Sequence, residues 1–294
     1  MPHQCIVAGV DDSPEGIRSA NLAWVLASEC GVDCRLVHAA REYWATSGGT
    51  DIPIDVGAMN RAVLQIATER LTEALSPTIP QETLANLDVR LGRAAVLIRD
   101  VATERDARLV VLGAKHHAAV TRWIGGSTVH NVVRTSKVPV LVSCMEATTV
   151  NRVLVAVDVS YAATPTVDEA KRYAQLFGAQ IRIIHVIEPL PLIAALPIAL
   201  DQNAYYRISA EQFNKEVSQL THGTDADVVV RHGVADDTVA AEVEEWKADL
   251  LVVGSHGKGW VDRLLVGSTT ERLLNHLPTS TLVVPVPAPQ DSDS

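Results

Sequence analysis

A glycine-rich stretch near the carboxyl end of the chain has residue types and spacing suited to binding a phosphate group. Leu250–Val253 is apolar and ends at Gly254, a basic loop follows, and Gly267 then precedes two hydroxyl residues, Ser268 and Thr269. Glycine lets the backbone come close to a ligand. The first N–H groups of a helix have no intrahelical partner and lie at the positive end of its dipole. The stretch therefore predicts a strand, a wide anion-binding loop and a helix start.

Two common phosphate motifs do not fit this spacing, whereas one interpretation without a ligand does. A P-loop needs Lys-Ser/Thr directly after its second glycine, and the dinucleotide fingerprint needs a compact G-x-G-x-x-G. Ser268 and Glu271 match a capping box, which starts a helix with no ligand present. From this stretch alone, a phosphate site and a purely structural turn are both open.

An earlier copy of the same pattern favours the phosphate site. Gly92, Gly113 and Gly126-Ser127-Thr128 recur in the second half at an offset of 141 residues. Val10-Asp11-Asp12-Ser13 and Leu36-Val37-His38 recur in similar form at an offset of 147. The six-residue difference falls between His38 and Gly92, so one connection is shorter in the second half. The chain is a tandem duplication of one domain.

Composition limits the partners that the protein is expected to have. The 294 residues suit two domains of about 145 residues each. The net charge is −10 and no Lys/Arg-rich block is present, so nucleic acid and anionic membranes are not expected as partners. A polyphosphate would have to be bound locally, by backbone N–H groups and a few nearby cations.

The cysteines and apolar segments favour a cytoplasmic protein. All four cysteines lie in the first half, between Cys5 and Cys144, so disulfides are not part of the repeated scaffold and a reducing compartment is the simpler context. Met1–Gly9 lacks the basic and then apolar pattern of a signal peptide. Pro189–Leu200 is the most apolar stretch, but it is too short to span a bilayer and contains three prolines.

The elements that must position these residues alternate between strand and helix in each half. Such alternation predicts βαβ units, right-handed crossovers and a parallel sheet with helices on both faces. In the first half we expect strands over Cys5–Val10, Cys34–Ala39, Leu87–Leu91, Leu109–Gly113 and Val138–Val142, helices over Pro14–Cys30, Val63–Leu75, Ala95–Glu104 and Ser127–Thr135, and a loop over Tyr43–Gly57. In the second half we expect strands over Arg152–Val157, Gln180–Ile187, Asp227–Arg231, Leu250–Gly254 and Thr281–Val284, with helices ending near Gly178 and over Tyr205–Leu220, Thr238–Ala248 and Ser268–His276. The predicted domains are residues 1–146 and 151–286, with 287–294 as a disordered tail.

The glycine pattern resembles that of the universal stress protein family. In that family G-x2-G-x9-G-[ST] follows a strand, and V-D-x-S closes the first strand of the same domain. The second half matches completely, whereas the first half has His116 where the second glycine should be. The resemblance covers nearly the whole chain. It implies two tandem doubly wound, Rossmann-like parallel sheets of five strands, of the adenine nucleotide alpha hydrolase-like type, with strand order 3-2-1-4-5.

The resemblance also implies a ligand, which is ATP with or without Mg²⁺. In open α/β sheets the ligand binds beyond the carboxyl ends of the strands where the strand order reverses, here strands one and four. The residue after each second-strand histidine would present its backbone to adenine. The site residues implied for the second domain are Ala156, Asp158, Val186, Gly254, His256, Gly257, Lys258, Gly267, Ser268 and Thr269. Those implied for the first domain are Gly9, Asp11, Ala39, Gly113, Lys115, His116, Gly126, Ser127 and Thr128.

Alternatives remain for several of these residues. Asp11 and Asp158 could accept hydrogen bonds from ribose hydroxyls or an adenine amine, or could only cap the following turns. His116 adds a Cβ where the family has none, although it belongs to a local basic cluster that could bind an anion in another geometry. No metal site is expected there, because no acid or cysteine stands at ligand spacing. His38 and His185 are expected to be structural.

The resemblance implies nucleotide binding in a regulatory stress response rather than turnover. A slow ATPase or nucleotide hydrolase is an alternative, but the sequence shows no nucleophile–base pair, no carboxylate cluster for Mg²⁺ and no P-loop lysine. A nucleotide-free dimerisation scaffold is another. The apolar last strands resemble the pairing surface of the family, which implies an internal pseudo-dimer of the repeats and a homodimer of chains. A regulatory protein partner is implied but not identified.

Overall fold

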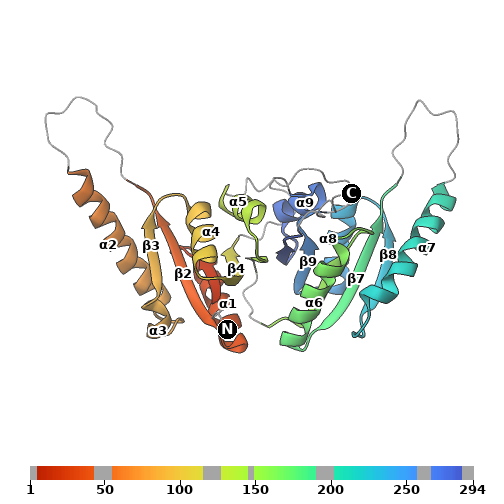
Figure 1. The fold of residues 1–294 in the computed structure, drawn as a ribbon, viewed down its shortest axis with the longest axis horizontal. Helices are drawn as coiled ribbons and strands as arrows, with labels where there is room; N and C mark the ends of the chain where they lie inside the picture. The colour runs from red at the N-terminus through yellow and green to blue at the C-terminus, as the bar shows by residue number, and fades with distance from the viewer. Residues whose placement is uncertain are drawn as a thin grey trace, which may run out of the picture. The chain divides into compact units, whose positions relative to one another are not determined.

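The computed structural model describes residues 5–42, 55–114, 127–144, 149–189, 202–256 and 266–286. The chain divides into two compact units, one in each half of the sequence (Figure 1). In each unit strands and helices alternate along the chain. The predicted α/β class and tandem duplication are therefore confirmed.

The first unit contains the elements expected from its hydrophobic pattern. Its strands are β1 (Cys5–Gly9), β2 (Asp33–Ala40), β3 (Leu87–Leu91), β4 (Ala107–Gly113) and β5 (Val140–Ser143). Its helices are α1 (Pro14–Cys30), α2 (Val56–Leu75), α3 (Gln81–Leu84), α4 (Ala94–Glu104) and α5 (Ser127–Thr135).

The second unit repeats this order of elements. Its strands are β6 (Arg152–Ala156), β7 (Gln180–Ile187), β8 (Asp227–His232), β9 (Leu250–Gly254) and β10 (Ser280–Val284). Its helices are α6 (Ala163–Phe177), α7 (Gln202–Leu220), α8 (Ala235–Trp246) and α9 (Ser268–His276).

Each unit has the predicted strand order 3-2-1-4-5. The order is β3-β2-β1-β4-β5 in the first unit and β8-β7-β6-β9-β10 in the second. The strand pairs are parallel, and Ala156 at the end of β6 lies between Ile184 of β7 and Val253 of β9. The chain passes from β6 to β7 and β8 on one side of the sheet and then to β9 and β10 on the other side, so the strand order reverses between β6 and β9. A crevice therefore opens beyond the carboxyl ends of β6 and β9.

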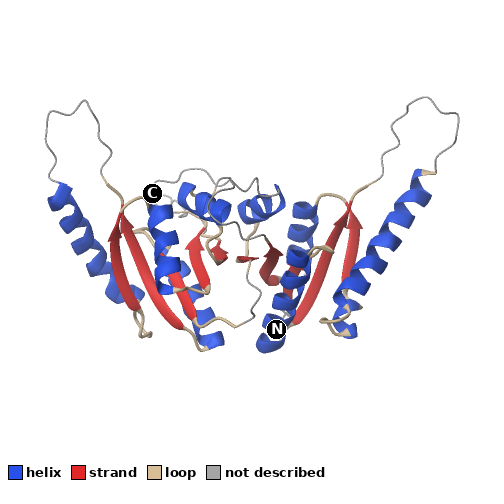
Figure 2. Cartoon of the chain, turned by 180° about the vertical axis from the view of Figure 1, so that it is seen from behind, coloured by secondary structure: helices blue, strands red, loops and turns tan. Residues whose placement is uncertain are grey.

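Helices cover both faces of each sheet (Figure 2). In the second unit α6 and α7 contact each other on one face, and α8 and α9 contact each other on the other face. The central strands are consequently buried on both sides, and Val153, Leu154 and Val155 of β6 have no exposed surface. Their continuous apolar sequence is typical of a parallel sheet covered by helices.

Local sequence signals account for the limits of α1. The Ser13 hydroxyl accepts a hydrogen bond from the Gly16 N–H at 3.1 Å, and Pro14 occupies the first helical position. Gly31 ends the helix with a φ of 63°. This left-handed conformation is accessible to glycine without steric cost.

Several predicted limits differ from the structure by one to a few residues, and the largest differences are at the starts of α2, α7 and α8. The loop predicted over Tyr43–Gly57 ends earlier, since α2 begins at Val56, where the Asp55 carboxylate accepts from the Ala58 N–H at 2.9 Å. The short helix α3 was not predicted, because four residues carry too little periodicity to detect. Helix α8 begins at Ala235 rather than at Thr238 and ends at Trp246 rather than at Ala248, because Lys247 adopts a φ of 54°.

Two predictions concern residues that the structure does not describe or describes only in part. The apolar stretch Pro189–Leu200 lies outside the described residues except for Pro189, and the tail 287–294 lies outside them entirely. Among the described residues, no helix combines the length and apolar character needed to cross a membrane.

Candidate functional site

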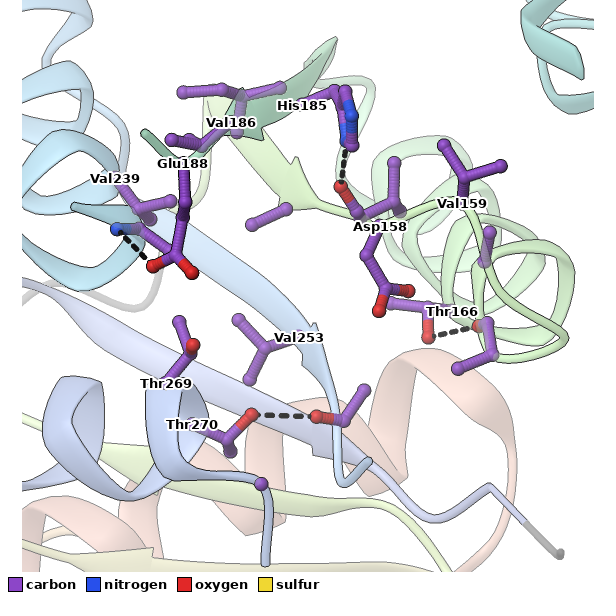
Figure 3. A pocket seen from close by; sticks show the side chains of 18 of the residues that line it. Asp158, Val159, Thr166, His185, Val186, Glu188, Val239, Val253, Thr269 and Thr270 are labelled. Atoms are coloured by element: carbon purple, nitrogen blue, oxygen red, sulfur yellow. Dashed lines mark hydrogen bonds between the residues drawn. The ribbon is translucent and has the colours of Figure 1, made fainter. Parts of the chain in front are cut away.

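A cavity of about 400 Å³ lies in the second unit, beyond the carboxyl ends of β6, β7 and β9. Its volume is within the range of small-molecule sites in proteins. Figure 3 shows Asp158 and Val186 from the ends of β6 and β7 around the same space as Thr269 from the start of α9. The cavity thus occupies the crevice that the strand order creates.

The structure brings the sequence-predicted residues of the second unit together at this cavity. Gly257 and Lys258 lie outside the described residues. The other predicted residues all line the cavity, and they are Ala156, Asp158, Val186, Gly254, His256, Gly267, Ser268 and Thr269.

The first turn of α9 is fastened to the end of β9. The Thr270 hydroxyl donates to the Gly254 carbonyl at 2.8 Å, and the Gly267 N–H donates to the Ser255 carbonyl at the same distance. Ser255 in turn donates its N–H to the carbonyl of Val284 in β10 at 2.8 Å. These bonds hold the beginning of α9 at the cavity.

The capping-box interpretation of this helix start is wrong. Gly267 is the N-cap residue and Ser268 is already the first helical residue, so Ser268 cannot cap the helix. No side chain caps α9. The backbone at Gly267 has a φ of −56° and a ψ of 142°. The N–H groups of its first turn, which lack partners within the helix, therefore remain available to a ligand on the side lined by Ser268 and Thr269.

Asp158 and Ser160 lie in the turn after β6 and make different contacts there. The Ser160 hydroxyl donates to the Asp158 carboxylate, and it accepts a hydrogen bond from the Ala162 N–H at 3.2 Å. The serine thus binds the backbone of the turn while the half-buried carboxylate of Asp158 lines the cavity. The carboxylate of Asp158 therefore borders the cavity and also takes part in the turn through Ser160.

The two second-strand histidines have a structural role. His185 is buried, its Nδ1 lies 2.9 Å from the Val157 carbonyl, and its ring stacks on Phe213 with centroids 4.4 Å apart. In the first unit, His38 Nδ1 lies 2.8 Å from the Val10 carbonyl. Each histidine joins the second strand to the residue that follows the first strand, and so fixes the rim of the crevice.

Glu188 is a cavity residue that the sequence analysis missed. Its carboxylate accepts a hydrogen bond from the N–H of Ala235, the first residue of α8, at 3.1 Å (Figure 3). The first turn of α8 also carries Asp236 and Asp237. Negative charge therefore already occupies the positive end of this helix. An anionic ligand group is therefore disfavoured at the start of α8, where a carboxylate already accepts from the first N–H group of the helix.

Helix α7 supplies a second missed group. Tyr205, Ser209 and Gln212 line the cavity, although the sequence indicated only a helix in this region. Their spacing of four and three residues places them on one helical face. The spacing was detectable in the sequence, but which face of α7 meets the cavity depends on tertiary packing.

At the end of β4 in the first unit, the backbone of α1 comes very close to the strand. A Cβ atom on Gly113 would lie 2.2 Å from the carbonyl oxygen of Glu15, so the first turn of α1 packs directly on the end of β4. A Cβ on Gly16 would lie 2.2 Å from the Asp11 carboxylate. In the second unit Ala163 stands at the position of Gly16 in the repeat, at the offset of 147 residues, and α6 begins there.

The other predicted residues of the first unit are only partly brought together. Gly9 is enclosed, because a Cβ there would lie 2.6 Å from Ile98 Cδ1. Ala39 lines a different cavity of about 540 Å³, between β2 and α2, at which Arg70 forms an ion pair with Asp12. Ser127 and Thr128 begin α5. Lys115, His116 and Gly126 lie outside the described residues.

The described residues show no metal centre. Within the described ranges, no group of three or more His, Cys, Asp or Glu side chains is arranged to hold a metal ion. None of the four cysteines, all of which lie in the described ranges, forms a disulfide bond. The polar groups of the described cavity are backbone N–H groups, hydroxyls, two carboxylates, the Gln212 amide and the imidazoles of His185 and His256.

The sheets and the cavity define a tandem Rossmann-like α/β protein with a candidate ligand site at the topological switch point of its second unit. The model of the universal stress protein family matches residues 3–143 and again residues 149–285. The chain belongs to the universal stress protein family, as its glycine pattern indicated.

Individual relatives match about half of the chain. A universal stress protein of Thermus aquaticus is 29% identical over 132 residues, which cover 45% of this chain and 96% of that protein. One from Mycolicibacterium smegmatis is 33% identical over 143 residues, covering 45% of this chain and 47% of that protein. Among solved structures, a universal stress protein from Archaeoglobus fulgidus matches with a TM-score of 0.62 at 21% identity, over 97% of this chain and 99% of the other. That likeness shows a shared fold.

Proposed function

We propose that the second unit binds ATP in the 400 Å³ cavity and that this binding serves a regulatory role in a stress response. The proposal rests on one observation, which is that the described site residues predicted for this unit lie around a single cavity. They come from β6, β7, β9 and the start of α9, and the cavity is at the switch point of the sheet. A purely structural repeat would not require them to surround open space.

The charges around the cavity orient the ligand. The phosphates lie against the first turn of α9 and the backbone of Gly254, where N–H groups are available and no side chain caps the helix. The nucleoside lies towards Asp158 and Val186, where a carboxylate accepts hydrogen bonds from hydroxyl or amine groups. Glu188 excludes phosphate from the start of α8, which supports this orientation.

The described cavity offers little support for turnover. A Ser–His contact does occur, with Ser255 Oγ 2.8 Å from His256 Nδ1. The Ser255 hydroxyl is buried, however, and accepts a hydrogen bond from the Val286 N–H at 3.0 Å. It is therefore part of the strand-end scaffold rather than a nucleophile. We propose binding without efficient hydrolysis, with any Mg²⁺ carried on the phosphates of the ligand.

The remaining functional proposals concern location and assembly. We propose a cytoplasmic protein whose repeats pair through their apolar last strands, β5 and β10, and whose chains form a homodimer. A protein partner then transmits the nucleotide state. Light scattering at micromolar protein concentration tests the dimer, and a strict monomer would contradict that part.

Mass spectrometry of the native ligand tests the proposed function. The protein is purified rapidly without added nucleotide and denatured, and the released small molecules are identified. We expect an adenine nucleotide in substoichiometric or equal amount, and steady-state assays with added ATP should show negligible turnover. No nucleotide released and no ATP bound in a subsequent titration would favour the scaffold alternative, whereas sustained turnover would favour the hydrolase.

A further inference from the structure

The polar face of α7 lies beside the place proposed for the nucleoside. Phe213, the residue after Gln212, is fully buried and stacks on His185. His185 directly precedes Val186, whose backbone is proposed to face the base. This contact fixes α7 over the end of β7 and brings Tyr205 to the cavity.

A chain of aromatic contacts holds the half-buried ring of Tyr205 in place. Its ring centroid lies 5.9 Å from that of Tyr206, at an angle of 46°. The Tyr206 ring stacks on His232 at the end of β8, with centroids 4.2 Å apart. The Tyr206 hydroxyl also accepts a hydrogen bond from Gln202 at 2.9 Å. The position of Tyr205 is therefore set by both α7 and β8.

The first unit lacks this arrangement. The corresponding helix α2 presents Val63, Ile66 and Ala67 to the 540 Å³ cavity, together with Arg70 in its ion pair with Asp12. No Tyr, Trp or Phe is among the described residues that line that cavity. An aromatic wall at the cavity is thus a property of the second unit rather than of the repeat in general.

We propose that Tyr205 is the platform on which the base of the bound nucleotide stacks, and that it gives the second unit a preference for purine over pyrimidine nucleotides. The proposal rests on the proposed function and names a residue that sets its specificity. An aromatic side chain can stack on any base, because every base has a π-face. The larger ring system of a purine overlaps more of the tyrosine ring, so the stacking contact favours ATP over CTP.

Calorimetric titration of the full-length protein with ATP, CTP and inorganic triphosphate tests this role. We expect the unsubstituted protein to bind ATP about tenfold more tightly than CTP. Tyr205→Leu should weaken ATP binding by about tenfold and bring the ratio of the two affinities near one, with triphosphate binding unchanged. Tyr205→Phe keeps the ring and should retain the preference. Ile208→Ala, on the exposed face of the same helix, is the matched control.

The outcomes distinguish stacking of Tyr205 on the base from a role of Tyr205 in supporting the cavity wall. If Tyr205→Leu weakens ATP and CTP by the same factor, Tyr205 only supports the cavity wall and the proposal is overturned. Unchanged ATP affinity in Tyr205→Leu overturns it as well. Both results leave the proposed function standing. If the unsubstituted protein binds no nucleotide at all, the proposed function fails and this inference fails with it.

Discussion

The carboxylate of Glu188, just beyond β7, accepts a hydrogen bond from the N–H of Ala235 at the start of α8, 3.1 Å away. Helices α8 and α9 both begin at this cavity, and the Glu188 contact makes the charge at the start of α8 differ from that at the start of α9. The positive end of α8 is neutralised by protein carboxylates, whereas that of α9 meets the cavity without a capping side chain. The cavity therefore has one end suited to phosphate and one suited to hydrogen-bond donors.

Asp158→Ala is expected to affect binding of the nucleoside but not binding of the phosphates. Removing the carboxylate should weaken ATP binding by about tenfold, because a hydrogen bond to a charged group contributes about 1.5–3 kcal/mol. Binding of inorganic triphosphate should change little, since the phosphate end is untouched. Competition titrations with both ligands provide the measurement. Asp11→Ala, at the repeat-related position of the first unit, is the control and should leave ATP affinity unchanged. An equal loss for both ligands would mean that Asp158 acts on the loop rather than on the nucleoside.

The two units are expected to differ in affinity. In the first unit the backbone of Glu15 packs directly against Gly113 at the end of β4, which narrows the space beside that strand. Calorimetry on the full chain should give one tight site per chain, with any second site at least about tenfold weaker, a difference of about 1.4 kcal/mol. Two equal sites would show that the packing of α1 on β4 opens readily in solution.

Stability at alkaline pH is expected to depend on a buried thiol. Burial raises the pKa of Cys34 from 9.0 to about 12, and the neighbouring Cys5 adds to the rise. Between these values the unfolded chain releases the proton and the folded chain keeps it, so stability falls as the pH rises from about 9 towards 12.

Chemical denaturation of the unsubstituted protein and of Cys34→Ala over this pH range measures the effect. The difference between their unfolding free energies should change by up to about 1.4 kcal/mol per pH unit, with the unsubstituted protein losing more. Cys30→Ala, at a half-exposed thiol, is the control and should follow the unsubstituted protein. Parallel curves for Cys34→Ala and the unsubstituted protein would contradict the pKa shift.

Much of the fold and part of the site could be predicted from the sequence because the chain carries its pattern twice. Gly254, Gly267 and Asp158 were found by their spacing after apolar runs, and parallel strands necessarily bring such residues to one edge of the sheet. Glu188 and Tyr205 were not found, since their roles depend on where α8 begins and how α7 packs. The start of α9 was predicted at the correct residue, but its cap was not. Sequence spacing cannot distinguish a serine at the N-cap from one at the first helical position.

The substitution Gly267→Ala tests the central claim most directly. The backbone at this residue, with a φ of −56° and a ψ of 142°, is accessible to alanine, so folding should survive. A side chain at the N-cap would lie where the chain approaches the phosphates. We expect ATP binding to weaken by at least about tenfold, or about 1.4 kcal/mol, with at most a small fall in melting temperature because alanine is a poorer N-cap residue than glycine. Gly57→Ala in α2 is the matched control and should bind ATP normally. Full ATP affinity in Gly267→Ala would contradict the account, because the start of α9 would then be a structural turn and not a phosphate site.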